Sequence, residues 1–425
     1  MKPGDDLYQK YIAILQEELR PAMGCTEPIA LAYAGAKARQ VLGALPDRVR
    51  LAVSGNIIKN VKSVVVPNTG GQRGMAAALC AGIVAGDPDR ELQVISQVPA
   101  AMHETIRTYR DTVDLEIVPV ESTLVFDIDL RVFAGADQVR LRIVNNHTNI
   151  VCIEKNGEKL LNLPVSESSE DHLTDKSCLN VASIVEFADC LNVEDVRPFV
   201  GEQIRCNMEI AQEGLNGNWG ANIGQVILRR QGGSLEKKAA AYAAAGSDAR
   251  MSGCEKPVVI VSGSGNQGIT ASVPVAVYAR ETGASEEQLL RAVALSDLVT
   301  IHQKAGIGRL SAYCGAISAD CGAGAGIAYL EGGDAQAIAH TVVNAIAILS
   351  GTICDGAKAS CAAKIAAAVD AGILGYQMYL EGQQFYSGDG IVTKGADNTV
   401  HNIGRLAREG MRQTDRTILE IMMNC

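Results

Sequence analysis

The chain is poor in aromatic side chains, because five Phe, one Trp and eleven Tyr make up only 4% of its 425 residues. Its hydrophobic core must therefore be built mainly from Ala, Val, Ile and Leu. Basic residues are also in the minority, since 38 Lys and Arg stand against 48 Asp and Glu. A net charge of −10, with no basic stripe interleaved with aromatic residues, excludes a nucleic-acid-binding surface.

Long, purely apolar runs are missing as well. Acidic and basic residues are mixed throughout the N-terminal segment 1–20, so we expect no signal peptide. The stretches 257–279 and 335–354 lack charge but contain polar side chains, and we interpret both as buried core segments rather than membrane spans. We therefore expect a cytoplasmic protein that has neither a membrane nor a nucleic acid as its partner.

The length and the order of local patterns indicate the fold class. A chain of 425 residues is too long for one ordinary core, so two or three domains are expected. Short β-branched runs alternate with helical segments at first, and Ala-rich helical segments dominate later. We predict an α+β fold, with a mixed α/β domain at residues 1–165 and a mainly α-helical domain at residues 176–425. The polar segment Leu163–Asp175 is the predicted linker.

Individual elements follow from the same patterns. In the first domain, helices are predicted at residues 6–20, 28–43, 74–85 and 102–109. Strands are predicted at residues 48–53, 61–66, 91–95, 114–120, 124–131, 138–145 and 150–153, with a tight turn at Asn156–Gly157. One further strand is predicted at residues 258–261, directly before a glycine-rich loop.

Twelve cysteines are present, and none of them forms the closely spaced Cys pairs of a structural zinc site. Disulfides are rare in a reducing cytoplasm, so most of these residues are expected to be small buried hydrophobes. Cys314 and Cys321 are seven residues apart, as are Cys354 and Cys361, so each pair could share one helix face. From the residues alone, a metal or iron–sulfur site and four core thiols both remain open.

Several longer segments resemble known enzymes. The segments GRLSAYCGAISADCGAGAG (308–326) and SGTICDGAKASC (350–361) resemble the catalytic chain of the iron–sulfur L-serine dehydratases. Over nearly its whole length the chain is more similar still to the L-cysteine desulfidases. The segments that carry this second resemblance are PAMGCTEPIALA (21–32), SGNIIKNV (54–61), VVVPNTGG (64–71) and SGSGNQGITASVPV (262–275).

The resemblance implies a [4Fe-4S] cluster bound by Cys314, Cys354 and Cys361. The spacing of the last two is shorter here than in the dehydratases. The resemblance also implies that Cys25 is the catalytic base, and binding of the fourth iron by Cys25 is the alternative. Three protein ligands leave one iron open as a Lewis acid. Because the tail of some dehydratases places a Cys on this iron, Cys425 is predicted to occupy it at rest.

The surroundings of Cys25 bear on its role. It directly precedes a predicted helix whose first turn contains Pro28, and a helix N-terminus lowers the pKa of a thiol. The negative charge of Glu27 opposes this effect. A buried thiol beside a helix cap is the structural alternative to the catalytic role.

Two glycine-rich loops are candidates for binding the substrate carboxylate through backbone N–H groups. The predicted substrate-binding residues are Ser264 and Asn266 in the loop SGSGNQG (262–268), and Asn68, Thr69 and Gly70 in the loop VVVPNTGGQRG (64–74). The resemblance matches Asn266 to an Asn of the dehydratases. Lys59 or Arg73 would add positive charge, unless both lie on the surface. The first loop also fits the pattern G-x-G-x-x-G, but no second strand follows to complete a dinucleotide-binding unit.

These residues together predict an α,β-elimination from a small amino acid. The favoured reaction converts L-cysteine to sulfide, ammonia and pyruvate without pyridoxal phosphate. Dehydration of L-serine by the same residues is the first alternative. A non-catalytic iron–sulfur protein that senses oxygen or iron is the second. A homodimer is expected only because such assemblies are frequent among enzymes.

Overall fold

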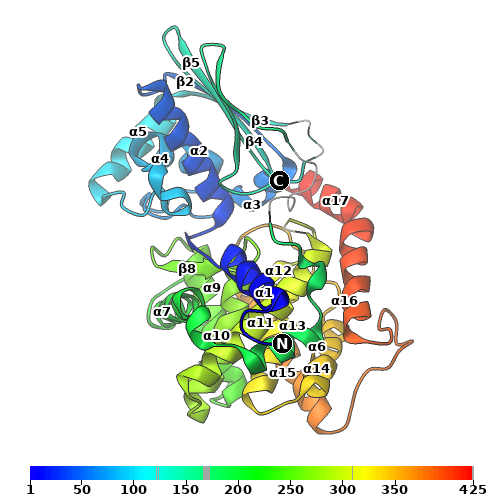
Figure 1. The fold of residues 1–425 in the computed structure, drawn as a ribbon. Coiled ribbons are helices and arrows are strands. Elements are labelled where there is room, and N and C mark those ends of the chain that lie inside the picture. The colour runs from blue at the N-terminus through cyan, green and yellow to red at the C-terminus, as the bar shows by residue number, and fades with distance from the viewer. Residues whose placement is uncertain (121, 123, 166–172, 309, 424–425) are drawn as a thin grey trace.

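The structure is a computed structural model that describes residues 1–120, 122, 124–165, 173–308 and 310–423. It contains two lobes, each with its own hydrophobic core (Figure 1). The N-terminal lobe comprises residues 24–165 and contains a sheet covered by helices. The helical lobe comprises residues 1–23 and 173–423. The predicted α+β fold is therefore confirmed.

The N-terminal lobe is built on one mixed sheet of six strands. Its elements are α2 (Thr26–Leu42), β2 (Arg48–Val53), α3 (Gly55–Val61), α4 (Gly74–Ala85), α5 (His103–Thr112), β3 (Asp114–Pro119), β4 (Asp127–Ala134), β5 (Asp137–Val144), β6 (Ile150–Lys155) and β7 (Glu158–Asn162). The strand order is β3-β2-β4-β5-β6-β7, in which only β2 and β3 pair in parallel. Alternate residues Val49, Leu51 and Val53 are buried, as a sheet with one face on the core requires.

Small residues let the helices of this lobe approach closely. An added Cβ at Gly82 in α4 would lie 1.9 Å from the carbonyl oxygen of Ala32 in α2. The two helix backbones are therefore in contact at this point. Ala and Gly provide this closeness, which explains how a chain with few aromatic residues still fills its core.

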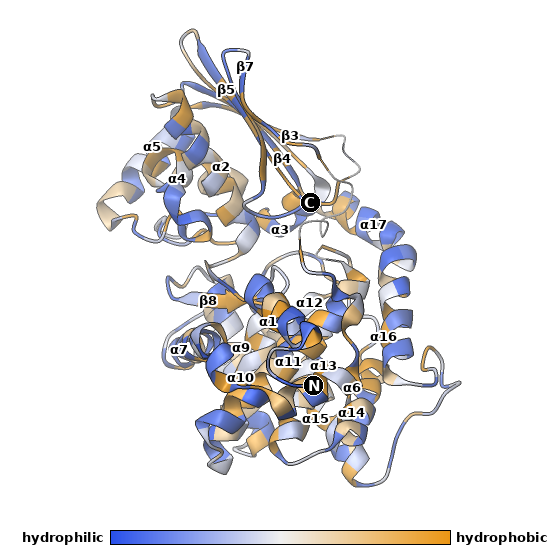
Figure 2. Ribbon diagram, in the orientation of Figure 1, coloured by the Kyte–Doolittle hydropathy of each residue, from blue (hydrophilic) through white to orange (hydrophobic). Residues whose placement is uncertain are grey.

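The helical lobe surrounds one long buried helix, α10. Every residue of α10 from Gly265 to Ala279 is buried. The elements of the lobe are α1 (Asp6–Glu18), β1 (Arg20–Met23), α6 (Val181–Cys190), α7 (Glu202–Asn216), α8 (Ile223–Gln231), α9 (Leu235–Met251), β8 (Pro257–Ile260), α10 (Gly265–Thr282), α11 (Glu286–Ile307), α12 (Gly315–Ser318), α13 (Asp320–Leu330), α14 (Ala335–Ile348), α15 (Ser360–Leu380), α16 (Ala396–Arg405), the short π-helix η6 (Leu406–Gly410) and α17 (Arg412–Met423). Hydrophobic residues are concentrated on its central helices, whereas α17 is mostly hydrophilic (Figure 2).

The N-terminal segment, residues 1–23, packs against the helical lobe. Tyr8 and Tyr11 of α1 pack their rings against Phe187 of α6. Strand β1 pairs with β8 in antiparallel orientation, with Arg20 opposite Ile260. The division at residues 1–165 and 176–425 stays a prediction, and the two cores follow it except at this N-terminal segment. The predicted linker lies partly outside the described residues.

Two predicted strands are wrong. Residues 61–66 include the end of α3 and a loop, and residues 91–95 begin within a 3₁₀-helix, η1 (Pro88–Gln93). Val64 and Val66 are nevertheless buried, so the apolar run reports burial rather than strand pairing. The strands β1 and β7 were not predicted. Within the described residues, no helix is both long and apolar enough to cross a membrane.

The last helix connects the two lobes. From α16 and η6, α17 runs along the side of the molecule to α3 of the N-terminal lobe (Figure 1). There Asp415 of α17 forms an ion pair with the buried Lys59 of α3. Leu419 also packs so closely that an added Cβ at Gly55 would lie 2.5 Å from its Cδ2 atom.

Candidate active site

A pocket between the lobes contains the predicted base and the three predicted cluster ligands. Cys25 comes from the N-terminal lobe, and Cys314, Cys354 and Cys361 come from the helical lobe. The other residues that line this cysteine pocket are Thr26, Glu27, Asn60, Arg250, Gly263, Ser264, Asn266, Gln267, Lys304, Leu310, Ser311, Tyr313, Gly315, Ala316, Gly356 and Ala357. The pocket has a volume of about 100 Å³.

Two of the cysteines are held together by their backbones. The N–H of Cys314 donates to the carbonyl of Thr352 at 3.0 Å, and the N–H of Cys354 donates to the carbonyl of Ala312 at 2.6 Å. Cys314 then caps α12, while Cys361 lies at the start of α15. Segments separated by 40 residues in the sequence therefore present their thiols to one pocket through backbone geometry.

The charges around these thiols favour one thiolate. The thiol of Cys314 donates a hydrogen bond to Cys354, and this bond lowers the pKa of Cys354 to about 5, against the opposing effect of burial. The positive charges of Lys59 and Lys304 act in the same direction as the hydrogen bond. The pKa of Cys314 is raised, first because its proton is held in that bond. One of the two sulfurs is thus ready to bind a metal without prior loss of a proton.

Cys25 behaves differently from the expectation for a helix terminus. It does cap the N-terminus of α2, but its side chain is 1% exposed. Burial raises the pKa of this thiol to about 12, and only the positive charge of Arg250 acts in the opposite direction. Glu27 and Cys361 raise it further. Desolvation therefore outweighs the helix dipole, because the dipole effect is small compared with complete burial.

Of the predicted substrate-binding residues, Ser264 and Asn266 line the cysteine pocket. Ser264 caps α10, and its side chain accepts a hydrogen bond from the N–H of Gln267 at 3.4 Å. The Oδ1 atom of Asn266 accepts hydrogen bonds from Ser247 at 3.2 Å and from Arg250 at 3.1 Å. The N-terminus of a long helix thus faces the thiols.

Asn68, Thr69 and Gly70 are not among the residues that line this pocket. The side-chain amide of Asn68 donates to the carbonyls of Ile95 and Ser96 at 2.9 and 3.1 Å. The hydroxyl of Thr69 donates to the carbonyl of Val66 at 2.7 Å. Their polar groups hold the loop itself in place, and the geometry gives them no contact with the four thiols.

The G-x-G-x-x-G pattern has a packing explanation. Among the described strands, β8 pairs only with β1, in antiparallel orientation, so no parallel βαβ unit surrounds it. An added Cβ at Gly268 would lie 2.1 Å from the carbonyl oxygen of Val259. This glycine therefore lets α10 pack against its own preceding strand.

Five polar residues that line the pocket are not among the site residues predicted from the sequence: Glu27, Asn60, Arg250, Gln267 and Lys304. Asn60 donates to the carboxylate of Glu27 at 2.8 Å, which fixes that carboxylate at the start of α2. Of the predicted cations, Lys59 is buried in its pair with Asp415, and Arg73 donates to the carbonyl of Ser63 away from the pocket. Of the five pocket residues, Glu27, Asn60 and Gln267 lie within segments that carry the family resemblance, whereas Arg250 and Lys304 lie in ordinary helical patterns.

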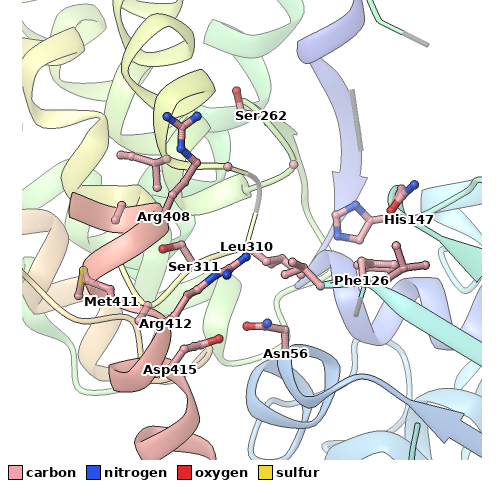
Figure 3. Close-up of a pocket in the computed structure, with 18 residues that line it drawn as sticks. Asn56, Phe126, His147, Ser262, Leu310, Ser311, Arg408, Met411, Arg412 and Asp415 are labelled. Carbon is pink, nitrogen blue, oxygen red and sulfur yellow. The ribbon is translucent and has the colours of Figure 1, made fainter. Parts of the chain in front are cut away.

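A second, larger cavity adjoins the cysteine pocket. It has a volume of about 320 Å³ and shares Gly263, Leu310 and Ser311 with the pocket. In Figure 3, Phe126 and His147 of the N-terminal lobe face Leu310 and Arg412 across this outer cavity. The outer cavity and the cysteine pocket therefore meet at these three residues.

The thiols that line the pocket are a donor set that fits an iron–sulfur cluster. In the part of the chain that the structure describes, no three Cys, His, Asp or Glu side chains converge as a single-ion site requires. The three thiols are instead distributed around one pocket wall, and thiolates are the ligands that iron–sulfur clusters use. Cys314, Cys354 and Cys361 therefore provide side chains of the kind that an iron–sulfur cluster uses.

Two further cysteines have different positions. Cys321 is completely buried in α13, with its sulfur against the side chain of Gln303, and does not line the pocket. Cys425 lies outside the described residues, so its predicted place on the open iron stays a prediction.

Comparisons with known proteins agree with the geometry of the cysteine pocket. The profile of the serine dehydratase alpha chain matches residues 89–420. A UPF0597 protein of Desulfitobacterium hafniense (strain Y51) is 57% identical over 424 residues, which cover 100% of this chain and 99% of that protein. UPF0597 proteins of Lachnoclostridium phytofermentans and Treponema denticola are 46% and 43% identical, over 98% of this chain in both cases and over 100% and 98% of their own lengths. The resemblance to the iron–sulfur dehydratases is confirmed, and the chain belongs to the serine dehydratase alpha chain family.

Proposed function

We propose that this chain is an L-cysteine desulfidase that depends on a [4Fe-4S] cluster. The observation that supports the proposal is the meeting of Cys25 from one lobe with Cys314, Cys354 and Cys361 from the other in a single pocket. Membership of a dehydratase family supports a lyase reaction. Reduced thiols of this kind persist in the cytoplasm, so the proposal includes that location.

Cys314, Cys354 and Cys361 would hold the cluster in this proposal. A cluster with three protein ligands supplies an open iron, which as a Lewis acid stabilises the departing sulfide. The chain itself must supply a base for the Cα proton and groups that orient the amino acid. The pocket contains both kinds of group.

Cys25 is the proposed base. Its thiolate takes the proton from Cα, the Cα–H electron pair forms the Cα=Cβ bond, and the C–S bond breaks with its electron pair on sulfur. The released aminoacrylate becomes an imine and reacts with water to give pyruvate and ammonia. Because burial raises the pKa of Cys25, the thiol must lose its own proton first, and the neighbouring Arg250 favours that loss. A strongly basic thiolate is then well matched to a weakly acidic C–H bond.

The decisive experiment compares L-cysteine with L-serine as substrates of anaerobically reconstituted protein. The proposal predicts release of equal amounts of sulfide and pyruvate from L-cysteine, with a higher kcat/KM than for L-serine. A reagent that traps pyridoxal phosphate should leave this activity intact. A preference for L-serine would replace the proposed substrate, and the name of the matched family favours this second candidate.

A further inference from the structure

Arg250 is a buried cation without an acidic partner. Its side chain belongs to the last turn of α9, and the residue is 4% exposed. One Nη atom donates to Asn266 at 3.1 Å, whereas Nε is buried and has no hydrogen-bond partner. Among the described residues, no carboxylate forms an ion pair with this guanidinium. A buried charge without a counter-charge is costly, so its retention in a pocket points to an anion that arrives from outside.

The fold holds the guanidinium against the first turn of α10. An added Cβ at Gly265 would lie 2.3 Å from Nε and 2.7 Å from the central carbon of the guanidinium. Only a glycine leaves room for the arginine at this point. The N–H groups of the first turn of α10 lack partners within the helix and add positive potential beside it. Arg250 and the start of α10 thus form one positive surface in the wall of the cysteine pocket.

Gln267 adds a second group without partners. It is completely buried and lines the same pocket, and neither its Nε2 nor its Oε1 atom has a hydrogen-bond partner. An added Cβ at Gly315 would lie 2.5 Å from the Oε1 atom, so the amide faces the residue that follows Cys314. A buried amide without partners is costly unless a ligand completes it.

We propose that Arg250 binds the α-carboxylate of the substrate and that the Oε1 atom of Gln267 accepts a hydrogen bond from its α-ammonium group. This inference deepens the proposed function, on which it rests, and defines the ligand class as free α-amino acids with a short side chain. A guanidinium suits a carboxylate because it can donate two parallel hydrogen bonds. The substrate's third substituent is then free to point toward the thiols.

Three related ligands test the proposed carboxylate and ammonium contacts separately. L-cysteine carries both charged groups, cysteamine lacks the carboxylate, and 3-mercaptopropionate lacks the ammonium group. Their dissociation constants are measured anaerobically by calorimetry, both on cluster-free protein and on reconstituted protein. The unmodified chain should bind L-cysteine and 3-mercaptopropionate, which carry a carboxylate, more tightly than cysteamine.

The variants are Arg250→Gln, Arg250→Lys and Gly265→Ala. Arg250→Gln should weaken L-cysteine and 3-mercaptopropionate by about 100-fold and leave cysteamine unchanged. Arg250→Lys should recover part of this loss. Gly265→Ala keeps the positive charge but displaces it, so it should weaken the same two ligands. The matched control is Arg140→Gln, because Arg140 pairs with Asp129 on the sheet and should leave all three affinities unchanged.

A fourth variant, Gln267→Leu, should weaken L-cysteine and cysteamine by about 10-fold and spare 3-mercaptopropionate. If Arg250→Gln weakened the binding of all three ligands equally, the inference would be overturned, because Arg250 would then act on the thiol group that the three ligands share. Unchanged affinities would also overturn it. Arg250→Gln should melt no lower than the unmodified chain, since no internal acid loses its partner; if it does not fold, Arg250→Lys and Gly265→Ala decide.

The outcomes also distinguish this inference from the proposed function. Carboxylate-selective binding that depends on Arg250, in a protein that releases neither sulfide nor pyruvate, would refute the proposed function alone. Sulfide release with an unchanged KM in Arg250→Gln would refute the inference alone.

Discussion

Cys25 and Cys354 line the same pocket from opposite lobes, but the pKa values of their two thiols are shifted in opposite directions. In the N-terminal lobe, burial raises the pKa of Cys25 to about 12. In the helical lobe, the hydrogen bond from Cys314 lowers the pKa of Cys354 to about 5, and the charge of Lys59 from the N-terminal lobe acts in the same direction. One lobe therefore offers a thiolate for a metal, and the other holds a thiol that becomes a strong base once it ionises. If Cys354 is a cluster ligand and Cys25 is the base, as proposed, substitutions in the two lobes should affect iron binding and proton transfer separately.

The largest effect is expected in the helical lobe. Cys354→Ala should abolish iron and sulfide binding during anaerobic reconstitution, because the pocket loses its most ionised ligand. Activity should disappear with the cluster. Iron and acid-labile sulfide analysis measures this directly. Cys321→Ala is the matched control, since Cys321 is buried nearby without lining the pocket, and its variant should keep a full complement of iron.

The N-terminal lobe should give the opposite pattern. Cys25→Ala should lower kcat by about 1000-fold while the iron content stays constant, because a positioned base contributes on that scale. Cys80→Ala provides the control, as burial likewise raises the pKa of Cys80 to about 12 but its side chain lies outside the pocket. A changed electron paramagnetic spectrum of Cys25→Ala without substrate would instead identify Cys25 as a ligand of the fourth iron.

The pKa values themselves can be tested in cluster-free protein with iodoacetamide. At pH 7 Cys354 should be modified about 100-fold faster than Cys25, since greater ionisation outweighs the lower nucleophilicity of its thiolate. The rate at Cys354 should fall as the pH drops through about 5, and the rate at Cys25 should still rise between pH 7 and pH 10. Peptide mass spectrometry assigns each site. The same midpoint for both thiols would remove the contrast between the lobes.

The smallest effects concern two asparagines, one in each lobe. Asn266→Ala should raise KM about 10-fold, because Arg250 loses the hydrogen bond that positions it. Asn68→Ala should leave KM unchanged and lower the free energy of unfolding by about 2 kcal/mol, since the carbonyls of Ile95 and Ser96 lose their donor. Steady-state kinetics and chemical denaturation separate the two outcomes. A changed KM in Asn68→Ala would instead indicate that the loop containing Asn68 contributes to substrate binding.

Sequence patterns were sufficient where local preferences and tertiary packing agree. The helix Gly74–Ala85 and the strand Arg48–Val53 have the bounds that the sequence predicts. The segment 61–66 failed because its valines are buried in a loop, and apolar runs alone do not distinguish a buried loop from a strand. Pairing of β1 with β8 could not be predicted, because it joins segments more than 200 residues apart.

The candidate site likewise contains some residues that the sequence indicates and others that only the folded structure reveals. The roles of the cysteines follow from the family resemblance, because their spacing alone leaves core thiols open. Arg250 occupies an ordinary position in an Ala-rich helix, and Gln267 lies in a glycine-rich loop in which only Ser264 and Asn266 were predicted to bind substrate. What distinguishes them is that Nε of Arg250 and both amide atoms of Gln267 are buried without a hydrogen-bond partner among the described residues, and this is a property of the folded chain alone. The two glycine-rich loops looked equivalent in sequence, and only their hydrogen bonds tell them apart.

The position of α17 has a consequence for biosynthesis. A ribosome makes a chain from its N-terminus, so all four pocket cysteines emerge before Arg412–Met423. Until then Lys59 lacks Asp415, and nothing from α17 holds the lobes together. In the proposed function, the cysteine pocket would therefore be complete in sequence before the lobes are joined. The ion pair of Asp415 and the contact of Leu419 with Gly55 are then the last of the described links between the lobes to be synthesised.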